Sequence, residues 1–158
     1  MLYGIIIAKA DFRIRVFMKA DIENKLLAAI RVRGRVGVRQ SISETLDRLN
    51  LRRVNNLSLL YGTKSNIGMI AKCSDFITYG EISQEVLENL LQKKEIKASK
   101  EDISAISSGK KKVSELARMP IRLHPPRHGY EAVKRSYANK GSLGYRGDKI
   151  NDLIKRMA

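Results

Sequence analysis

The sequence has one cysteine and no apolar run long enough to cross a bilayer. Cys73 alone excludes an internal disulfide bond and a zinc site built from several cysteines. Every apolar run is shorter than the roughly 18–20 residues that a transmembrane helix needs. The N-terminal region carries charges and lacks a long apolar core followed by Ala-x-Ala, so no signal peptide is expected. We therefore expect a soluble cytoplasmic protein without a membrane partner.

Acidic residues are scarce relative to basic ones. The 158 residues include 16 Asp and Glu against 31 Lys and Arg, a net charge of +15, which predicts a polyanionic partner. Residues 28–60 hold seven Arg and no Lys, for a net charge of +5, and residues 120–158 have a net charge of +6. An all-arginine block favours bidentate phosphate recognition over a general role in solubility.

Patterns typical of enzymes are missing as well. His124 and His128 are four residues apart, but Pro125 and Pro126 exclude a helix that would bring both over a metal ion. There is no Walker loop, nucleophile elbow or pair of carboxylates. We expect no enzyme activity, cofactor, metal site or small-molecule substrate. The alternative from another class is an RNA-modifying or RNA-cleaving enzyme with the two histidines as acid and base.

Residues 26–33 predict a strand with one buried face and one basic face. Ile30 and Val32 alternate with Arg31 and Arg33, and successive side chains of a strand point to opposite faces.

The following residues, up to 94, predict the order helix, strand, helix, strand, helix. Ser41 and Glu44 have the spacing of a capping box, in which each side chain binds a free amide at a helix start. Short connections favour one compact α+β unit. The expected elements are a helix over 41–50, a strand over 54–61, a helix capped by Ser65 or Asn66 that ends near Asp75, a strand over 76–79, and a helix capped by Ser83 with Val86, Leu87, Leu90 and Leu91 inside.

The rest of the chain differs in character. Residues 93–112 are polar, with a weak helical signal at Ile103 and Ile106, and predict a mobile excursion. Residues 111–118 favour a short helix before Pro120. Residues 120–147 contain all three prolines and four glycines, which predicts an extended segment held by a partner. Asp148 is expected to cap a last helix whose inner face holds Ile150, Leu153, Ile154 and Met157.

Residues 1–25 contain two short apolar stretches that predict a pair of strands with a tight connection. The alternative is a chain whose natural start is Met18.

Gly34 and Gly37 form a Gly-x-x-Gly element between the basic strand and a helix. Glycines let a backbone approach phosphates closely, and a helix start supplies free amides. With Arg35 and Arg39 beside it, we favour RNA contact over a plain tight turn. Because such loops also occur in KH-type RNA binders, a free KH-like single-stranded RNA-binding protein is the alternative function.

Residues 122–130 place basic side chains on a stiff backbone. Pro125 and Pro126 favour a polyproline-like rod, which loses less entropy when it binds a nucleic acid. Tyr130 and Tyr145 are expected to stack on bases.

Several motifs occur together in a specific order. They are Ile30-Arg-Val-Arg-Gly-Arg-Val-Gly-Val, Glu44-Thr-Leu-Asp, Arg53-Val-Asn, Gly68-Met, Thr78-Tyr-Gly-Glu, Ile121-Arg-Leu-His-Pro-Pro-Arg and Leu143-Gly-Tyr-Arg-Gly-Asp-Lys-Ile-Asn-Asp-Leu. From about Leu26 to the C-terminus, the chain resembles the archaeal-type family of large-subunit ribosomal protein thirty, the counterpart of eukaryotic large-subunit protein seven.

The resemblance implies an α+β fold with a βαβαβ core, whose three-stranded antiparallel sheet is similar to the ferredoxin-like arrangement. It implies an archaeal C-terminal extension with an extended Pro/Gly segment and a terminal helix. The implied role is structural, in translation: binding and bracing 23S rRNA in the cytoplasmic large ribosomal subunit, near 5S rRNA and neighbouring ribosomal proteins. The expected division is 1–25 as an atypical N-terminal extension, 26–94 as the core and 95–158 as an rRNA-binding extension.

The expected rRNA contacts come from two sources. Those implied by the resemblance are Arg31, Arg33, Arg35, Arg52, Arg53, Arg122, His124, Arg127 and Arg146. The motifs and the basic blocks add Gly34, Gly37, Arg39, His128, Tyr130, Lys134, Arg135, Tyr145 and Lys149.

Overall fold

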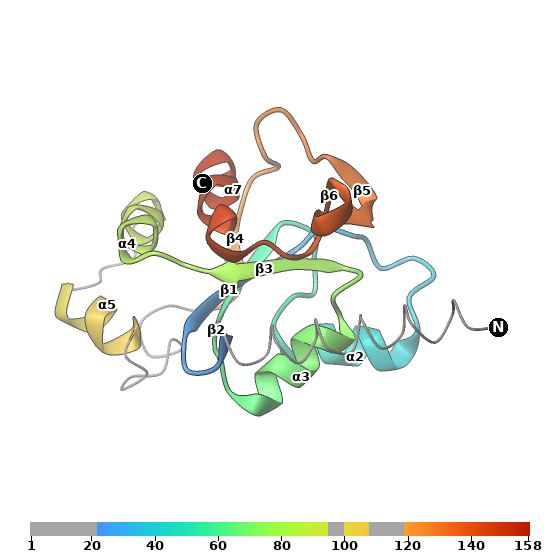
Figure 1. Cartoon of the computed structure of the whole chain (residues 1–158), viewed down its shortest axis with the longest axis horizontal. Coiled ribbons are helices and arrows are strands. Elements are labelled where there is room, and N and C mark those ends of the chain that lie inside the picture. Colours follow the sequence, from blue (N-terminus) through green and yellow to red (C-terminus); the bar gives the residue numbers. More distant parts are fainter. Residues whose placement is uncertain (1–21, 95–99, 108–118) are drawn as a thin grey trace, which may run out of the picture.

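The computed structural model describes residues 22–94, 100–107 and 119–158. Six strands of these residues form one sheet in the order β4-β2-β1-β3-β6-β5, and helices lie on both of its faces (Figure 1). The fold is therefore mixed α+β, as expected. The two strands predicted near the N-terminus and the short helix over 111–118 lie outside the described residues.

The centre of the sheet consists of β1 (Leu26–Arg31), β2 (Asn56–Tyr61) and β3 (Ile77–Glu81). β1 lies between the other two and pairs antiparallel with both, so that Leu27 is opposite Leu60 on one side and Glu81 on the other. This confirms the βαβαβ order and the antiparallel core. The prediction of a three-stranded sheet is wrong, because β4, β6 and β5 extend it on both sides.

One face of the sheet is covered by α2 (Gln40–Arg48) and α3 (Lys64–Lys72). Their inner side chains and alternate residues of β1 form one hydrophobic cluster, since successive side chains of a strand point to opposite faces. The buried members are Ile22, Leu27, Ala29, Leu46, Leu49, Leu51, Ile67, Ile70, Cys73 and Ile77.

The opposite face is covered by α4 (Gln84–Lys93), α5 (Lys100–Ser107) and α7 (Ile150–Met157). The predicted inner faces of α4 and α7 are confirmed, because all eight side chains named for them are buried in one cluster. The prediction of a mobile excursion is wrong for 100–107. Ile103 and Ile106 are three positions apart on a helix, so both reach the same cluster.

The C-terminal residues extend the chain's own sheet. β4 (Ile121–Arg122) pairs antiparallel with β2, and β6 (Gly141–Tyr145) pairs parallel with β3 and with β5 (Ala132–Ser136). The expectation that this whole segment is held by a partner is therefore wrong for these strands. The outer edges of β2 and β3 carry backbone groups that need hydrogen-bond partners. β4 supplies some of these partners to β2, and β6 supplies some to β3.

Three helix starts differ from the predictions. Arg39 is the N-cap of α2, and the predicted capping pair lies inside the helix without a side-chain cap bond. Thr63 caps α3, accepting a hydrogen bond from the Asn66 backbone N–H at 3.3 Å. Asp148 lies in the short helix η2 (Gly147–Lys149) and does not cap α7. Ser83 is the N-cap of α4 as predicted, without a side-chain cap bond.

Candidate nucleic-acid interface

The Gly-x-x-Gly loop, residues 32–39, is tied to the start of β3. The backbone N–H groups of Val32 and Arg33 both donate to the carbonyl oxygen of Phe76, at 3.0 and 3.1 Å. The Arg33 guanidinium carbon lies 5.0 Å from the centre of the Phe76 ring, and Nη1 donates to the Asp75 carbonyl oxygen at 3.3 Å. Arg33 is therefore half-buried, and the base of the loop is fixed.

Arg31 is buried under this loop, with 1% of its surface exposed. Its Nε donates to the carbonyl oxygen of Arg33 at 2.8 Å, and Nη2 donates to that of Gly34 at 3.0 Å. Its Nη1 donates to the carbonyl oxygens of Leu51 and Arg52, at 2.8 and 3.2 Å. The predicted basic strand face is therefore wrong at Arg31. This guanidinium binds the protein's own backbone.

The hydrogen bonds from the Arg31 side chain to backbone carbonyl oxygens also orient backbone N–H groups of the loop. In a trans peptide the N–H points away from the carbonyl of the same unit. Because the carbonyls of Arg33 and Gly34 point inward to Arg31, the N–H groups of Gly34 and Arg35 point outward. Among the described residues, neither amide has a hydrogen-bond acceptor. Two successive outward amides are a feature of anion-binding loops.

Asp47 on α2 links the loop to the turn that follows the helix. Its Oδ2 lies 3.6 Å from Arg35 Nη2, and its Oδ1 lies 3.7 Å from Arg52 Nε. Burial lowers the pKa of Arg31, and the charge of Arg35 acts in the same direction, whereas Asp47 opposes both. The carboxylate therefore offsets part of the repulsion among three neighbouring arginines. Asp47 is not among the site residues predicted from the sequence, since only the fold brings it between these arginines.

Asn55 joins the two basic blocks of the sequence. It has a left-handed backbone, with φ of 63°, and its N–H donates to the carbonyl oxygen of Arg31 at 2.9 Å. Its own carbonyl oxygen accepts from the Leu123 N–H at 3.0 Å, and its Oδ1 accepts from the Tyr130 hydroxyl at 2.7 Å. Asn55 is not among the site residues predicted from the sequence, although an Asn pair before a strand is typical of a turn.

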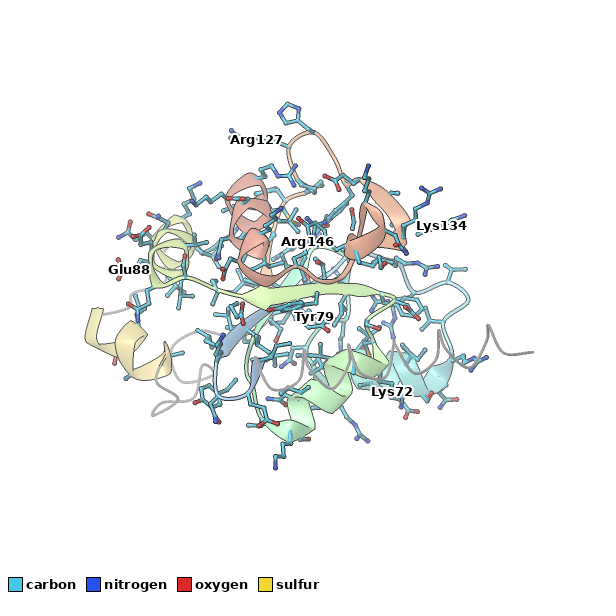
Figure 2. All side chains as sticks on the ribbon, in the orientation of Figure 1. Lys72, Tyr79, Glu88, Arg127, Lys134 and Arg146 are labelled. Carbon is cyan, nitrogen blue, oxygen red and sulfur yellow. The ribbon has the colours of Figure 1, made fainter. Side chains whose placement is uncertain are left out.

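The proline-rich segment is anchored by its backbone to the end of α7. The His124 N–H donates to the carbonyl oxygen of Met157 at 3.0 Å, and the Arg127 N–H donates to that of Arg156 at 3.2 Å. The side chains of Arg122, His124, Arg127 and His128 are exposed. Figure 2 shows Arg127 on the loop that stands out beyond α7.

Arg146, another of the predicted rRNA contacts, is buried, with 8% of its surface exposed. Its Nε donates to Thr78 Oγ1 at 3.0 Å, and its guanidinium carbon lies 4.6 Å from the centre of the Tyr137 ring. Burial is the main cause that lowers its pKa. Arg146 thus holds β6 and η1 (Tyr137–Asn139) to β3.

The two tyrosines predicted to stack on bases are half-buried. Tyr145 packs against Tyr79 with ring centres 5.6 Å apart, and its hydroxyl donates to Glu81 Oε2 at 3.3 Å. The Tyr130 hydroxyl donates to Asn55 Oδ1, and burial raises its pKa to about 12. Both hydroxyls therefore make hydrogen bonds within the fold.

The other predicted contacts are exposed. Lys134 and Arg135 lie on β5, an edge strand whose five residues are all exposed, and Figure 2 shows Lys134 extending away from the sheet. Lys149 is exposed in η2. The predicted contacts that are exposed in the loop and in the turn after α2 are Gly34, Arg35, Gly37, Arg39, Arg52 and Arg53.

The described ranges hold neither a candidate metal site nor a candidate membrane span. In residues 22–94, 100–107 and 119–158, no three His, Cys, Asp or Glu side chains cluster as metal ligands would. No helix of the same ranges has the length and apolar character needed to cross a membrane.

Comparison with known proteins identifies the family. The model of the family described as ribosomal protein L30p/L7e matches residues 27–77, which include β1 apart from its first residue, and all of α2, β2 and α3. The large ribosomal subunit protein uL30 of Thermoplasma volcanium is 41% identical over 152 residues, covering 84% of this chain and 92% of that protein. The chain belongs to the ribosomal protein L30p/L7e family. The predicted resemblance is thus confirmed.

Other archaeal members of the L30p/L7e family are similar over the same extent. The uL30 protein of Methanobrevibacter smithii is 38% identical over 151 residues, covering 84% of this chain and 99% of that protein. That of Nanoarchaeum equitans is 41% identical over 151 residues, covering 83% and 97%. Membership of a ribosomal protein family favours a structural role over the KH-like alternative.

Proposed function

We propose that this L30p/L7e protein binds and braces 23S rRNA, near 5S rRNA, through the exposed basic surface described above. As a family member, the chain is a structural constituent of the cytoplasmic large ribosomal subunit, with a role in translation. The observation that carries the rRNA proposal is the buried Arg31. It holds the loop and the turn after α2 together, so that Arg35, Arg52 and Arg53 are presented from a fixed backbone.

The chemistry of this surface suits folded RNA. An A-form helix presents phosphates and 2′-hydroxyls more than readable base edges, and arginine forks bind phosphate oxygens in pairs. The outward amides of Gly34 and Arg35 add donors that need no rearrangement. Because loop and turn are already ordered, little conformational entropy is lost on binding.

The proposed direct contacts are the exposed and half-buried members of the predicted set. Arg31 and Arg146 act through the backbone that they hold. The direct contacts are Arg33, Gly34, Arg35, Gly37, Arg39, Arg52, Arg53, Arg122, His124, Arg127, His128, Tyr130, Lys134, Arg135, Tyr145 and Lys149.

We also propose the division of the chain into an N-terminal extension over 1–25, a ribosomal core over 26–94 and an rRNA-binding extension over 95–158. The core and the extension share a hydrophobic cluster, since residues of β1, β2, α4 and α7 pack together. Neighbouring ribosomal proteins are proposed to meet the sides away from the basic loops. Glu88 on α4, on the opposite side of Figure 2 from Lys134, belongs to such a side.

The proposal is tested with the full chain and its large subunits. Tagged protein is followed through sucrose gradients at increasing salt, and its affinity for 23S rRNA is measured by filter binding. We expect the protein to stay with the large-subunit peak at moderate salt and to bind 23S rRNA more tightly than an unrelated RNA. Release at moderate salt, or equal affinity for both RNAs, would contradict the proposal.

A further inference from the structure

A groove of about 770 Å³ opens beside the edge strand β4. One wall is the turn that contains Val54 and Asn55, and another is Lys94 at the end of α4. The other described residues of the lining are 120–125. The groove lies where the turn after the core arginines meets the proline-rich segment.

The lining combines cations with apolar surface. Lys94 and Arg122 contribute cations and His124 contributes an imidazole, and the described residues of the lining include no carboxylate. Val54 and Pro125 contribute apolar surface beside them. This charge favours an anionic occupant and disfavours a basic segment of a neighbouring protein.

The lining is preformed. Asn56 pairs with Arg122 in the sheet, and the Leu123 N–H donates to the carbonyl oxygen of Asn55 at 3.0 Å. The Tyr130 hydroxyl donates a hydrogen bond to Asn55 Oδ1 at 2.7 Å, and this bond orients the Asn55 side-chain amide. Among the described residues, Asn55 Nδ2 has no acceptor, so this donor is available to a ligand.

We infer that the groove binds an unpaired ribonucleotide of the rRNA, and this rests on the proposed rRNA-binding function. Lys94 and Arg122 bind the flanking phosphates, and the His124 imidazole stacks on the base. Asn55 Nδ2 donates a hydrogen bond to an acceptor on the base edge. Unpaired bases are the parts of RNA that stack on rings and expose such edges, whereas a duplex does not fit a groove of this size.

The test uses the full chain with two RNA probes. The first is a uridine tetranucleotide, and the second is a blunt duplex long enough to stay paired, used at the same concentration of phosphate groups. We expect the tetranucleotide to shift the NMR signals of the Asn55 side-chain amide and of residues 121–124, and the duplex to leave them unchanged. Affinity for 23S rRNA is measured in parallel by filter binding.

Two variants preserve the fold while changing the groove. N55D keeps the oxygen that accepts the Tyr130 hydrogen bond and replaces the Nδ2 donor with a second oxygen. H124A removes the exposed imidazole and keeps the backbone hydrogen bond from residue 124 to the Met157 carbonyl oxygen. We expect each to weaken tetranucleotide binding about tenfold, the size expected for one stacked or hydrogen-bonded base. N89A, at an exposed position of α4, is the matched control and leaves the affinity unchanged.

The outcomes separate this inference from the proposed function. If 23S rRNA binds but the tetranucleotide shifts no groove signal, or shifts only those of the loop over 32–39, the inference fails and the proposed function stands. If 23S rRNA does not bind, the proposed function itself fails. In intact subunits, cross-links from residues 120–125 to a protein instead of RNA would also overturn the inference.

Discussion

The guanidinium of Arg31 donates a hydrogen bond from Nη2 to the carbonyl oxygen of Gly34, 3.0 Å away. The same side chain reaches the carbonyl oxygen of Leu51 through Nη1 at 2.8 Å. A buried cation therefore joins two segments that are separated by the whole of α2. Burial of this charge is tolerated because four hydrogen bonds to backbone carbonyl oxygens replace its hydration.

Replacement of Arg31 tests this role. Arg31→Met leaves inward carbonyls without donors, so we expect the free energy of unfolding to fall by about 2–4 kcal/mol. Arg31→Lys retains the charge but reaches fewer carbonyls, and its loss is expected to be smaller. Urea unfolding measures both. If Arg31→Met is as stable as the wild type, the guanidinium does not organise the loop.

Arg35 is exposed at the tip of the loop and is proposed to contact a phosphate. Arg35→Gln should reduce the slope of log affinity for 23S rRNA against log salt concentration by about 1. Lys64→Gln removes the same charge from the start of α3, at the other end of the sheet from the loop, and should leave the slope unchanged. Filter binding from low to moderate salt measures the slope for each variant and for the wild type. If Arg35→Gln has the same slope as the wild type, Arg35 does not contact a phosphate.

Gly34 and Gly80 form an informative pair. A Cβ at Gly34 meets no atom within 4 Å, so Gly34→Ala should change stability by less than about 1 kcal/mol and still weaken 23S rRNA binding by crowding the outward amides. A Cβ at Gly80 would collide with the carbonyl oxygen of Gly147. Gly80→Ala should therefore lose about 1–3 kcal/mol in urea unfolding. Unchanged rRNA affinity in stable Gly34→Ala would show that no phosphate approaches there.

Cys73 predicts a dependence of stability on alkaline pH. Burial raises the pKa of its thiol from 9.0 to about 11. The unfolded chain ionises first, so this contribution to stability is complete below about pH 9 and is lost as the pH rises to about 11. The stability difference between the wild type and Cys73→Ala should therefore narrow over that range, by on the order of 2 kcal/mol. Urea unfolding under reducing conditions measures it, and a constant difference would contradict the prediction.

Much of the core was predictable because local patterns carry it. The inner faces of α4 and α7 follow from helical spacing, and the element order up to residue 94 follows from alternating periodicities. Helix starts were less predictable, because Thr63 caps α3 although Ser65 and Asn66 have equally suitable side chains. Which one caps depends on where the chain turns after β2.

The interface was predictable as composition but not as geometry. Charge counts located the two basic blocks, and alternation placed Arg31 and Arg33 on one strand face. Alternation cannot show what covers that face, so the burial of Arg31 was missed. Asn55 and Asp47 stand in the quoted motifs but were not selected as site residues, because their partners are distant in sequence.

The sequence by itself determined the family, the element order of the core, and the positions of the arginine-rich block and the Pro/Gly-rich block. Each of these depends only on local residue spacing and composition. Only the tertiary structure decided that these blocks meet. The backbone of Asn55 bonds to Arg31 on one side and to Leu123 on the other. It also decided which arginines face outward, since burial depends on segments that long-range packing brings together.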